Sequence, residues 1–261
     1  MESALLKDAI SKSLSEAKET RAGLTKRQGI VVNAVPEAGM GLYLANYAVC
    51  LLNRQIDIFD DSLLLLENDR IPSACIISRG MIETHAFARL LAHSISKTLS
   101  EMSGKESVDQ CLDIVLRFTN SSRYKETEQK KLAKGVFELK DYEFTEQAKS
   151  RMTSSLAASE HVMNALRALF KEELDHTKAK ESQFEIVYDS LSEWVHTSQT
   201  SLFHNYVPET HLVPTSQGEV HLHEGALVQC VRALHFITDS KNVHEWLVEM
   251  GDEISRRYLA S

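Results

Sequence analysis

Apolar residues recur along most of the chain at spacings of three and four, which is the period of one face of an α-helix. Residues 3–21 show the pattern with Leu6, Ile10, Leu14 and Ala17 on one side. Pro72 and Ser73 favour the start of another helix, because proline is tolerated in a first turn. The period predicts helices at about 3–21, 37–67, 72–99, 107–119, 122–134, 144–178, 183–198, 224–238 and 241–258.

One segment departs from the helical period. Residues 201–223 contain Pro208 and Pro214, two of the four prolines in the chain. They end in an alternation of apolar and histidine side chains, in the order Val220, His221, Leu222, His223. Alternation is the pattern of a strand, so this segment predicts an irregular loop or a small hairpin.

The composition supports a helical fold. Only 10 glycines and 4 prolines occur among 261 residues, which argues against collagen-like, low-complexity and turn-rich β-sandwich proteins. We expect a single all-α domain over 1–261, a multi-helix bundle of long antiparallel helices. Its expected parts are an N-terminal helix and connector at 1–36, a core bundle at 37–200, the loop or hairpin at 201–223, and C-terminal helices at 224–261.

The net charge of −8 argues against a protein that coats nucleic acid over a broad face. A local basic stretch at 117–134 sets six basic side chains against Glu126 and Glu128. It is either a solvated helix face or a surface that holds RNA. The six residues are Arg117, Arg123, Lys125, Lys130, Lys131 and Lys134.

Three further features concern the expected location of the protein. The most apolar run, 38–52, has 15 residues including Asn46, whereas a membrane-spanning helix needs about 20. The first eight residues include three charged side chains and do not resemble a signal peptide. Four widely spaced cysteines without a C-x-x-C motif indicate small buried side chains in a reducing cytoplasm. The cysteines are Cys50, Cys75, Cys111 and Cys230.

The first candidate site lies in the helix predicted at 72–99. Arg79 and Glu83 are four residues apart and share one face of a helix that is apolar almost all round. Charges in such a place must be paired. The pair is either an ion pair that fixes the helix register or part of a polar site inside the bundle.

The second candidate is a stripe on the helix predicted at 183–198. Tyr188, Ser192 and His196 are spaced by four, so they lie along one face, and Ser182 with Glu185 forms a capping box at the start. His196 either caps the helix end or supplies the acid–base group of a cleft.

Metal binding is a third possibility. His221 and His223 would form a usable pair on one side of a strand, but no cysteine or carboxylate completes a recognised spacing. The motif Glu-x-x-His of di-iron bundles occurs as Glu173–His176 and Glu193–His196, with Glu67 and Glu83 as possible further carboxylates. We therefore predict neither a metal nor a cofactor.

Two motifs together carry a resemblance to a family. The sequence A-x3-S-R-x3-E-T at 74–84 and the sequence Y-x2-L-S-E-x-V-H at 188–196 resemble those of a widespread group of uncharacterised all-helical bacterial proteins, known as a domain of unknown function. The resemblance covers about 40–240 and implies an all-helical fold. The histidine of that group is commonly followed by Pro-Asn or Pro-Ser, whereas Thr197-Ser198 follows here.

The chain is also similar to HEPN domains, which are helical bundles that often act as metal-independent RNases in toxin and phage-defence systems. Their mark is an arginine followed, after four to six residues, by a histidine, and five residues separate Arg79 from His85. These domains usually place a polar residue after the arginine, where this chain has Gly80. On a straight helix the two side chains point about 120° apart, so the pair needs a local break or a dimer interface to converge.

The HEPN similarity implies cleavage of RNA by attack of a 2′-hydroxyl. His196 or His85 would be the base, Arg79 the cation, and Tyr188 or Ser192 positioning groups. The alternative is a non-catalytic scaffold or regulatory protein-binding module in which Arg79, Glu83, Tyr188 and His196 form a buried network. Long apolar helices also make a homodimer plausible.

Overall fold

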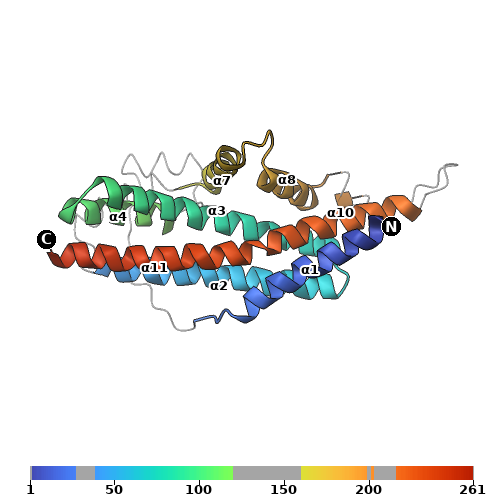
Figure 1. Cartoon of the computed structure of the whole chain (residues 1–261), viewed down its shortest axis with the longest axis horizontal. Helices are drawn as coiled ribbons and strands as arrows, with labels where there is room; N and C mark the ends of the chain where they lie inside the picture. Colours follow the sequence, from blue (N-terminus) through green and yellow to red (C-terminus); the bar gives the residue numbers. More distant parts are fainter. Residues whose placement is uncertain (1, 28–38, 120–159, 199–200, 203–215, 261) are drawn as a thin grey trace, which may run out of the picture. The chain divides into compact units, whose positions relative to one another are not determined.

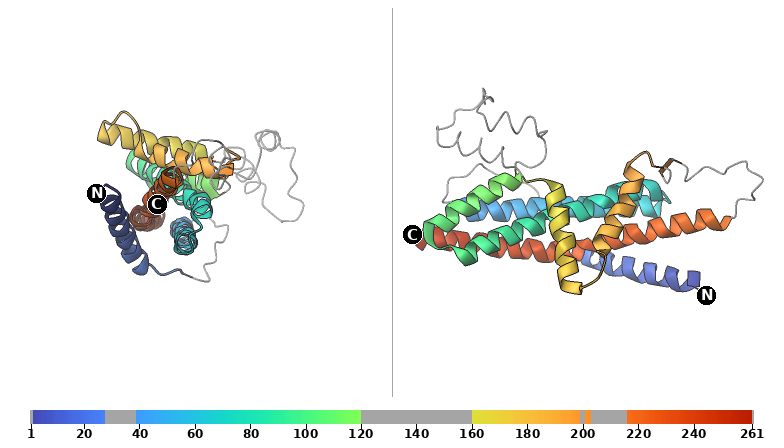
Figure 2. Two further views of the ribbon diagram at one scale, coloured as in Figure 1. Left: turned by 90° about the vertical axis from the view of Figure 1, so that its right-hand side faces the viewer. Right: turned by 90° about the horizontal axis from the view of Figure 1, so that it is seen from above.

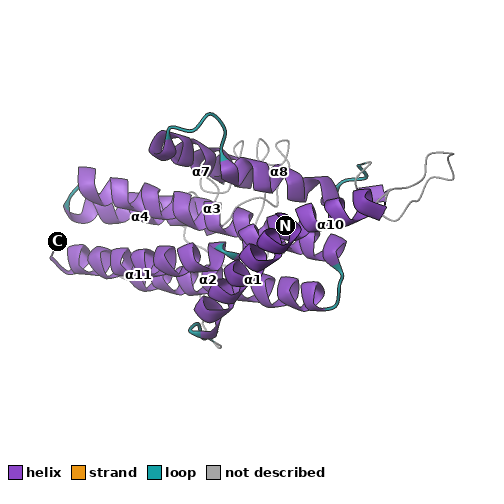
Figure 3. Ribbon diagram, turned by 45° about the vertical axis from the view of Figure 1, so that its right-hand side comes forward, coloured by secondary structure: helices purple, strands orange, loops and turns teal. Residues whose placement is uncertain are grey.

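The computed structural model describes residues 2–27, 39–119, 160–198, 201–202 and 216–260 (Figure 1). Helices make up most of these residues and no β-strand occurs among them (Figure 3), so the predicted all-α class is confirmed. The helices are α1 (Glu2–Ala22), α2 (Met40–Glu67), α3 (Ile71–Glu101), α4 (Gly104–Thr119), α7 (Val162–Thr177), α8 (Gln183–Val195), α10 (Ser216–Leu234) and α11 (Phe236–Ala260). In the part of the chain that the structure describes, no helix is long and apolar enough to cross a membrane.

Two predicted elements are corrected. The loop or hairpin predicted at 201–223 is wrong for residues 216–223, which begin α10 and therefore do not place His221 and His223 on a strand. An alternation of only four residues is also compatible with a helix, and no proline follows Pro214 to interrupt one. Residues 203–215 lie outside the described residues.

The long helix predicted at 144–178 begins only at Val162 in its described part. Glu160 and His161 are not helical, because their side chains cap the first turn. His161 Nδ1 accepts a hydrogen bond from the amide of Met163 at 3.1 Å, and Glu160 Oε1 accepts one from Asn164 Nδ2 at 2.9 Å. The helix predicted at 122–134 lies outside the described residues.

The helices divide into two compact units, which are described separately. The first unit comprises Met1–Gln28, Leu51–Ala86 and Ala168–Asn242, and the second comprises Gly29–Cys50, Phe87–Arg167 and Val243–Ser261. Helices α2, α3, α7 and α11 contribute residues to both units. The expectation of one domain over 1–261 stays a prediction.

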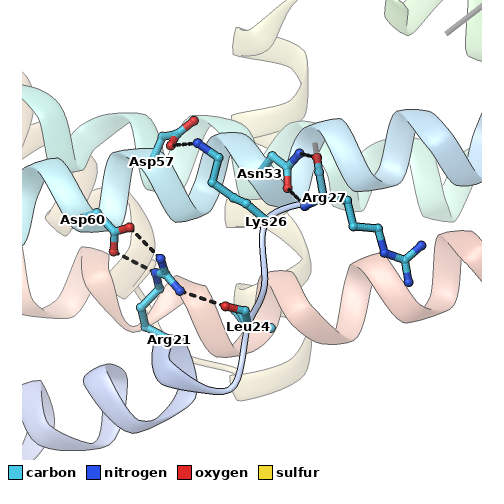
Figure 4. Close-up of polar contacts among 7 residues, drawn as sticks. All are labelled: Arg21, Leu24, Lys26, Arg27, Asn53, Asp57 and Asp60. Carbon is cyan, nitrogen blue, oxygen red and sulfur yellow. Dashed lines mark hydrogen bonds and ion pairs between the residues drawn. The ribbon is translucent and has the colours of Figure 1, made fainter. Parts of the chain in front are cut away.

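In the first unit, α1 and the segment after it are attached to α2 by charge (Figure 4). The guanidinium of Arg21 binds both carboxylate oxygens of Asp60, at 2.7 and 2.6 Å. Lys26 Nζ pairs with Asp57 at 2.5 Å. The side-chain amide of Asn53 hydrogen-bonds both the N–H and the C=O of Arg27, at 3.2 and 2.9 Å. Together these contacts hold the end of α1 and residues 23–27 against α2.

The rest of the first unit packs around the N-terminal half of α3. Helix α1 lies along α10 (Figure 2), where the Ser13 hydroxyl meets His235 Nε2 at 2.5 Å. The core is mostly apolar and includes fully buried side chains such as Ile56, Phe59, Met81, Leu191 and Leu234. Burial of this area is the main favourable contribution to folding.

In the second unit, α2 and α11 approach each other at two glycines. A Cβ atom on Gly41 would lie 2.0 Å from the carbonyl oxygen of Gly251, and one on Gly251 would lie 2.6 Å from the carbonyl oxygen of Gly41. Any side chain here would collide with backbone, which cannot move aside. The guanidinium of Arg257 on α11 also caps α3, since it donates to the carbonyls of Leu99 and Met102, each at 2.7 Å.

We predict that Gly41→Ala lowers the free energy of unfolding by roughly 2–4 kcal/mol, because the helices must separate to admit the methyl group. Urea denaturation measures the change. Gly225→Ala is the matched control, since Gly225 is an exposed helical glycine on α10 with nothing within 4 Å of the added Cβ. The control is expected to leave stability unchanged or to raise it by about 0.5–1 kcal/mol. Equal effects of the two substitutions would contradict the close approach.

Candidate functional site

Three of the five predicted site residues come together in the first unit, at the contact of α3 with α8. Arg79 Nε and Nη2 lie 2.9 and 2.7 Å from the same oxygen of Glu83, Oε1. The hydroxyl of Tyr188 donates to that oxygen as well, at 3.2 Å. The guanidinium carbon of Arg79 also lies 4.9 Å from the centre of the Tyr188 ring, a cation–π contact. We call these three residues the Arg79 cluster.

The local sequence explains why the cluster forms. Arg79 and Glu83 are one helical turn apart on α3, so their side chains meet without help from another element. Tyr188 is positioned by α8, whose start is fixed by Ser182: its hydroxyl accepts a hydrogen bond from the amide of Glu185 at 3.1 Å. This confirms Ser182 as the N-cap. The Tyr188 ring packs on Phe170 of α7, with ring centres 6.1 Å apart.

The cluster is partly open to solvent. The side chains of Arg79 and Glu83 are 21% and 26% exposed, whereas Tyr188 as a residue is buried. All the described donors converge on Oε1 of Glu83. Among the described residues, Glu83 Oε2 accepts no hydrogen bond and Arg79 Nη1 donates none, and neither atom is both buried and unpaired. An acceptor and a cationic donor therefore remain available to water or a ligand.

Burial raises the pKa of the Tyr188 phenol above its ordinary value of 10.0, and the charge of Glu83 acts in the same direction. The neutral hydroxyl is thus the form that the folded protein favours. The neutral hydroxyl donates a hydrogen bond to the Glu83 carboxylate and so holds it in place.

The other two predicted site residues lie apart from the cluster. The hydroxyl of Ser192 donates to the carbonyl oxygen of Tyr188 at 2.7 Å, within α8. His196 is exposed, ends α8 in an extended conformation, and its amide bonds to the carbonyl of Ser192. Among the described residues, no hydrogen bond or ion pair joins His196 to Arg79 or Glu83. The stripe breaks because α8 ends at Val195, one residue before the imidazole.

His85 does not meet Arg79 either. It is buried, its ring centre lies 4.9 Å from that of Phe236, and Nδ1 lies 3.4 Å from the hydroxyl of Ser240. Helix α3 runs without a break from Ile71 to Glu101, so the angle of about 120° between positions 79 and 85 is retained. The arginine and histidine of the HEPN pattern thus face different helices of the first unit.

The remaining candidates are placed as follows. Arg117 lies on α4, while Arg123, Lys125, Lys130, Lys131 and Lys134 lie outside the described residues. In the part of the chain that the structure describes, no three metal-ligating side chains come together. Glu173 instead accepts a hydrogen bond from the amide of Phe184 at 3.1 Å and contacts the hydroxyl of Ser182. Glu67 pairs with Lys18 at 2.9 Å.

Comparison with known families matches residues 45–210 to a family of unknown function, DUF5677. The chain belongs to this family. The match spans both helices of the Arg79 cluster. A comparison with curated proteins gave no match, and a comparison with solved structures gave none. Membership in DUF5677 thus agrees with the predicted resemblance and leaves the chemistry of the cluster to be argued from its atoms.

Two polar contacts escaped the sequence analysis. Cys75 on α3 and Cys230 on α10 meet in the first unit, and Arg54 on α2 donates to the Thr84 hydroxyl at 3.1 Å. For each of these two contacts, the only signal in the sequence is a small or polar residue on a mostly apolar helix face. Such a residue does not indicate which distant residue it contacts. The burial of Cys75, Cys111 and Cys230 agrees with the prediction, while Cys50 is half-buried.

We predict that Tyr188→Phe changes how stability depends on pH. The folded protein holds the phenol proton more tightly than the unfolded chain, so wild-type stability is lost as pH rises from about 10 through the raised pKa. The variant lacks this loss. At pH 7 to 8 it should be less stable by about 1 kcal/mol, the value of one hydrogen bond. Urea denaturation from pH 8 to 11 tests both statements, and parallel curves throughout would contradict the assignment.

Proposed function

We propose that this DUF5677 protein cleaves RNA at the Arg79 cluster, with Glu83 as proton acceptor and Arg79 as the cation that stabilises the transition state. The observation that supports this is the arrangement around Glu83. Its Oε1 receives all the described donors, while Oε2 has no partner among the described residues, and neither has Arg79 Nη1. The ion pair therefore offers a carboxylate oxygen and a cationic nitrogen with bonding capacity, and both side chains are partly exposed to solvent.

These groups match what phosphodiester cleavage by a 2′-hydroxyl needs. The carboxylate oxygen takes the proton of the 2′-hydroxyl, the 2′-oxygen forms a bond to phosphorus, and the bond to the 5′-oxygen breaks. The departing 5′-oxygen takes a proton from solvent, which leaves a 2′,3′-cyclic phosphate. The guanidinium offsets the extra negative charge on the phosphoryl oxygens in the transition state. Because protein groups supply both functions, we propose that the reaction proceeds without a metal ion.

The assignment changes the roles expected from the sequence. A general base must come within hydrogen-bonding reach of the proton that it removes, near the cation that neutralises the phosphate. Neither His85 nor His196 contacts Arg79 in the described structure, whereas Glu83 does. Tyr188 is then a positioning residue, because its hydroxyl hydrogen-bonds Oε1 and holds the carboxylate in place. The homodimer and the cytoplasmic location stay expectations from the sequence.

Cleavage of a labelled single-stranded RNA by the purified full chain, in buffer with a chelator, tests the proposal. Glu83→Gln keeps the shape of the side chain and removes the base, so we expect a loss of about 10²–10⁴-fold in rate. Arg79→Ala should lose about 10²–10³-fold, as for other groups that stabilise transition-state charge. The product should carry a 2′,3′-cyclic phosphate, and an RNA with a single 2′-deoxy position should resist cleavage there.

Three controls make the outcome decisive. Asp189→Asn removes an exposed carboxylate next to Tyr188 and should leave the rate unchanged. His196→Ala tests which residue is the general base. A large loss of cleavage rate in this variant, with full activity in Glu83→Gln, would identify His196 as the base. Thermal unfolding checks that each variant is folded. Equal cleavage by all the folded proteins would indicate a contaminating nuclease, and no cleavage by the wild type would refute the proposal.

A non-catalytic module is the second candidate. The observation that favours it is that Arg79 and Glu83 neutralise each other while Tyr188 ties α8 to α3, so the cluster satisfies its own charges. On this proposal the wild type does not cleave RNA, and its activity is to bind and regulate a protein partner. Glu83→Gln would then lower the midpoint of thermal unfolding and alter no rate.

A further inference from the structure

Two cysteine thiols meet in the core of the first unit, away from the Arg79 cluster. Cys75 Sγ on α3 lies 3.3 Å from Cys230 Sγ on α10, and both residues are fully buried. They are 155 positions apart in the sequence, so only the fold brings them together. Both cysteines are free. Among the described residues, neither Cys50 nor Cys111 has another cysteine at this distance.

The surroundings of the two sulfurs differ. The hydroxyl of Ser78, one turn after Cys75 on α3, lies 3.6 Å from Cys230 Sγ. Cys75 Sγ faces Cys230 Sγ, a contact in which either thiol can be the donor, and it lies 4.0 Å from the carbonyl oxygen of Ala226, to which it can also donate. A hydroxyl donor thus lies beside Cys230, and a carbonyl acceptor lies beside Cys75. Hydrogen bonds from Cys75 and Ser78 lower the pKa of the Cys230 thiol, while the contact with Cys230 and burial raise that of Cys75.

We infer that Cys75 and Cys230 form an oxidation site, at which a hydroperoxide converts the two thiols to a disulfide that joins α3 to α10. In the first step the Cys230 sulfur, as thiolate, attacks one peroxide oxygen, the O–O bond breaks, and a sulfenic acid forms with release of water or an alcohol. In the second step the Cys75 sulfur attacks Cys230 Sγ and expels the sulfenic oxygen as water. Both electrons come from the thiols, and the peroxide is reduced.

The geometry favours this product over other fates of the two sulfurs. A disulfide bond is about 2.0 Å long, so the sulfurs need to approach by little more than 1 Å, which rotation of two short side chains supplies. A sulfenic acid on Cys230 would form beside the thiol that resolves it. This proximity should prevent the further oxidation to sulfinic acid that an isolated cysteine undergoes.

Burial of the two thiols determines how fast they are oxidised, and the disulfide determines how oxidation changes stability. Because both thiols are enclosed, the peroxide reaches them only when the helices open locally, so oxidation should be slower than that of the half-buried Cys50. Once formed, the bond closes a loop of about 155 residues and restricts the unfolded chain. We expect the oxidised protein to melt at a temperature higher by roughly 5 °C or more.

The experiment uses the full chain with Cys50→Ser and Cys111→Ser, which leaves only the two thiols of the site. Hydrogen peroxide is added, the reaction is followed with time, and unreacted thiols are alkylated. Mass spectrometry of the folded monomer should show a loss of about 2 Da, and proteolysis should give a peptide linking 75 to 230. A reductant should reverse both changes and the rise in melting temperature.

Ser78→Ala and the wild-type chain extend the test. Removal of the Ser78 hydroxyl takes away a donor to Cys230, so formation of the disulfide should slow several-fold while the linked peptide stays the same. The wild-type chain should give the same linkage, which guards against a folding defect in the doubly substituted protein. Overoxidised but unlinked sulfurs, links only between separate molecules, or no reaction of the folded chain would each overturn the inference.

Discussion

The burial of α3 constrains the whole first unit. This part of the helix is apolar on most of its circumference, so each polar group that it carries must find a partner on another helix. Five of them do, and the partners come from four helices. Ser78 meets Cys230 on α10, the carbonyl of Met81 accepts from Gln55 on α2, Glu83 accepts from Tyr188 on α8, Thr84 accepts from Arg54 on α2, and His85 meets Ser240 on α11.

This set of contacts fixes the register of α3 as well as its stability. A shift of one residue would turn every polar side chain by about 100° toward an apolar neighbour, which costs more than any single contact is worth. The same register separates Arg79 from His85, because the fold directs one toward α8 and the other toward Phe236. The spacing that suggests a HEPN arginine–histidine pair is therefore used here for two independent packing contacts.

The sequence predicts this fold well where information is local. Helical periods, the Ser182 cap and the pairing of Arg79 with Glu83 depend on residues within one or two turns, and each is confirmed. Prediction fails where the signal is short. Four alternating residues at 220–223 could not be distinguished from a helix without their surroundings. The end of α8 before His196 has no strong breaker, so the stripe looked longer than the helix.

Contacts between distant parts of the chain could not be predicted from one sequence. The residues around Cys75 do not indicate Cys230 as its partner, and those around Gly41 do not indicate Gly251. Each of the four residues is compatible with its own helix whether or not its partner is present. The segment at 22–27 was expected only as part of a connector, yet Asn53 and Asp57 hold it on α2. Such contacts depend on which helix faces come together, which the hydrophobic period does not specify.

Two arginine–carboxylate pairs in the first unit differ in geometry, and the difference bears on the proposed function. Arg21 engages both oxygens of Asp60, the paired arrangement that gives the strongest and most specific contact. Arg79 and Glu83 lie on one helix, where the four-residue spacing brings two guanidinium nitrogens to a single oxygen. A pair selected for stability alone would gain from the first arrangement. The second arrangement uses only one carboxylate oxygen and gains less. It leaves a carboxylate oxygen and a cationic nitrogen with bonding capacity, which are the groups that the proposed substrate would bind.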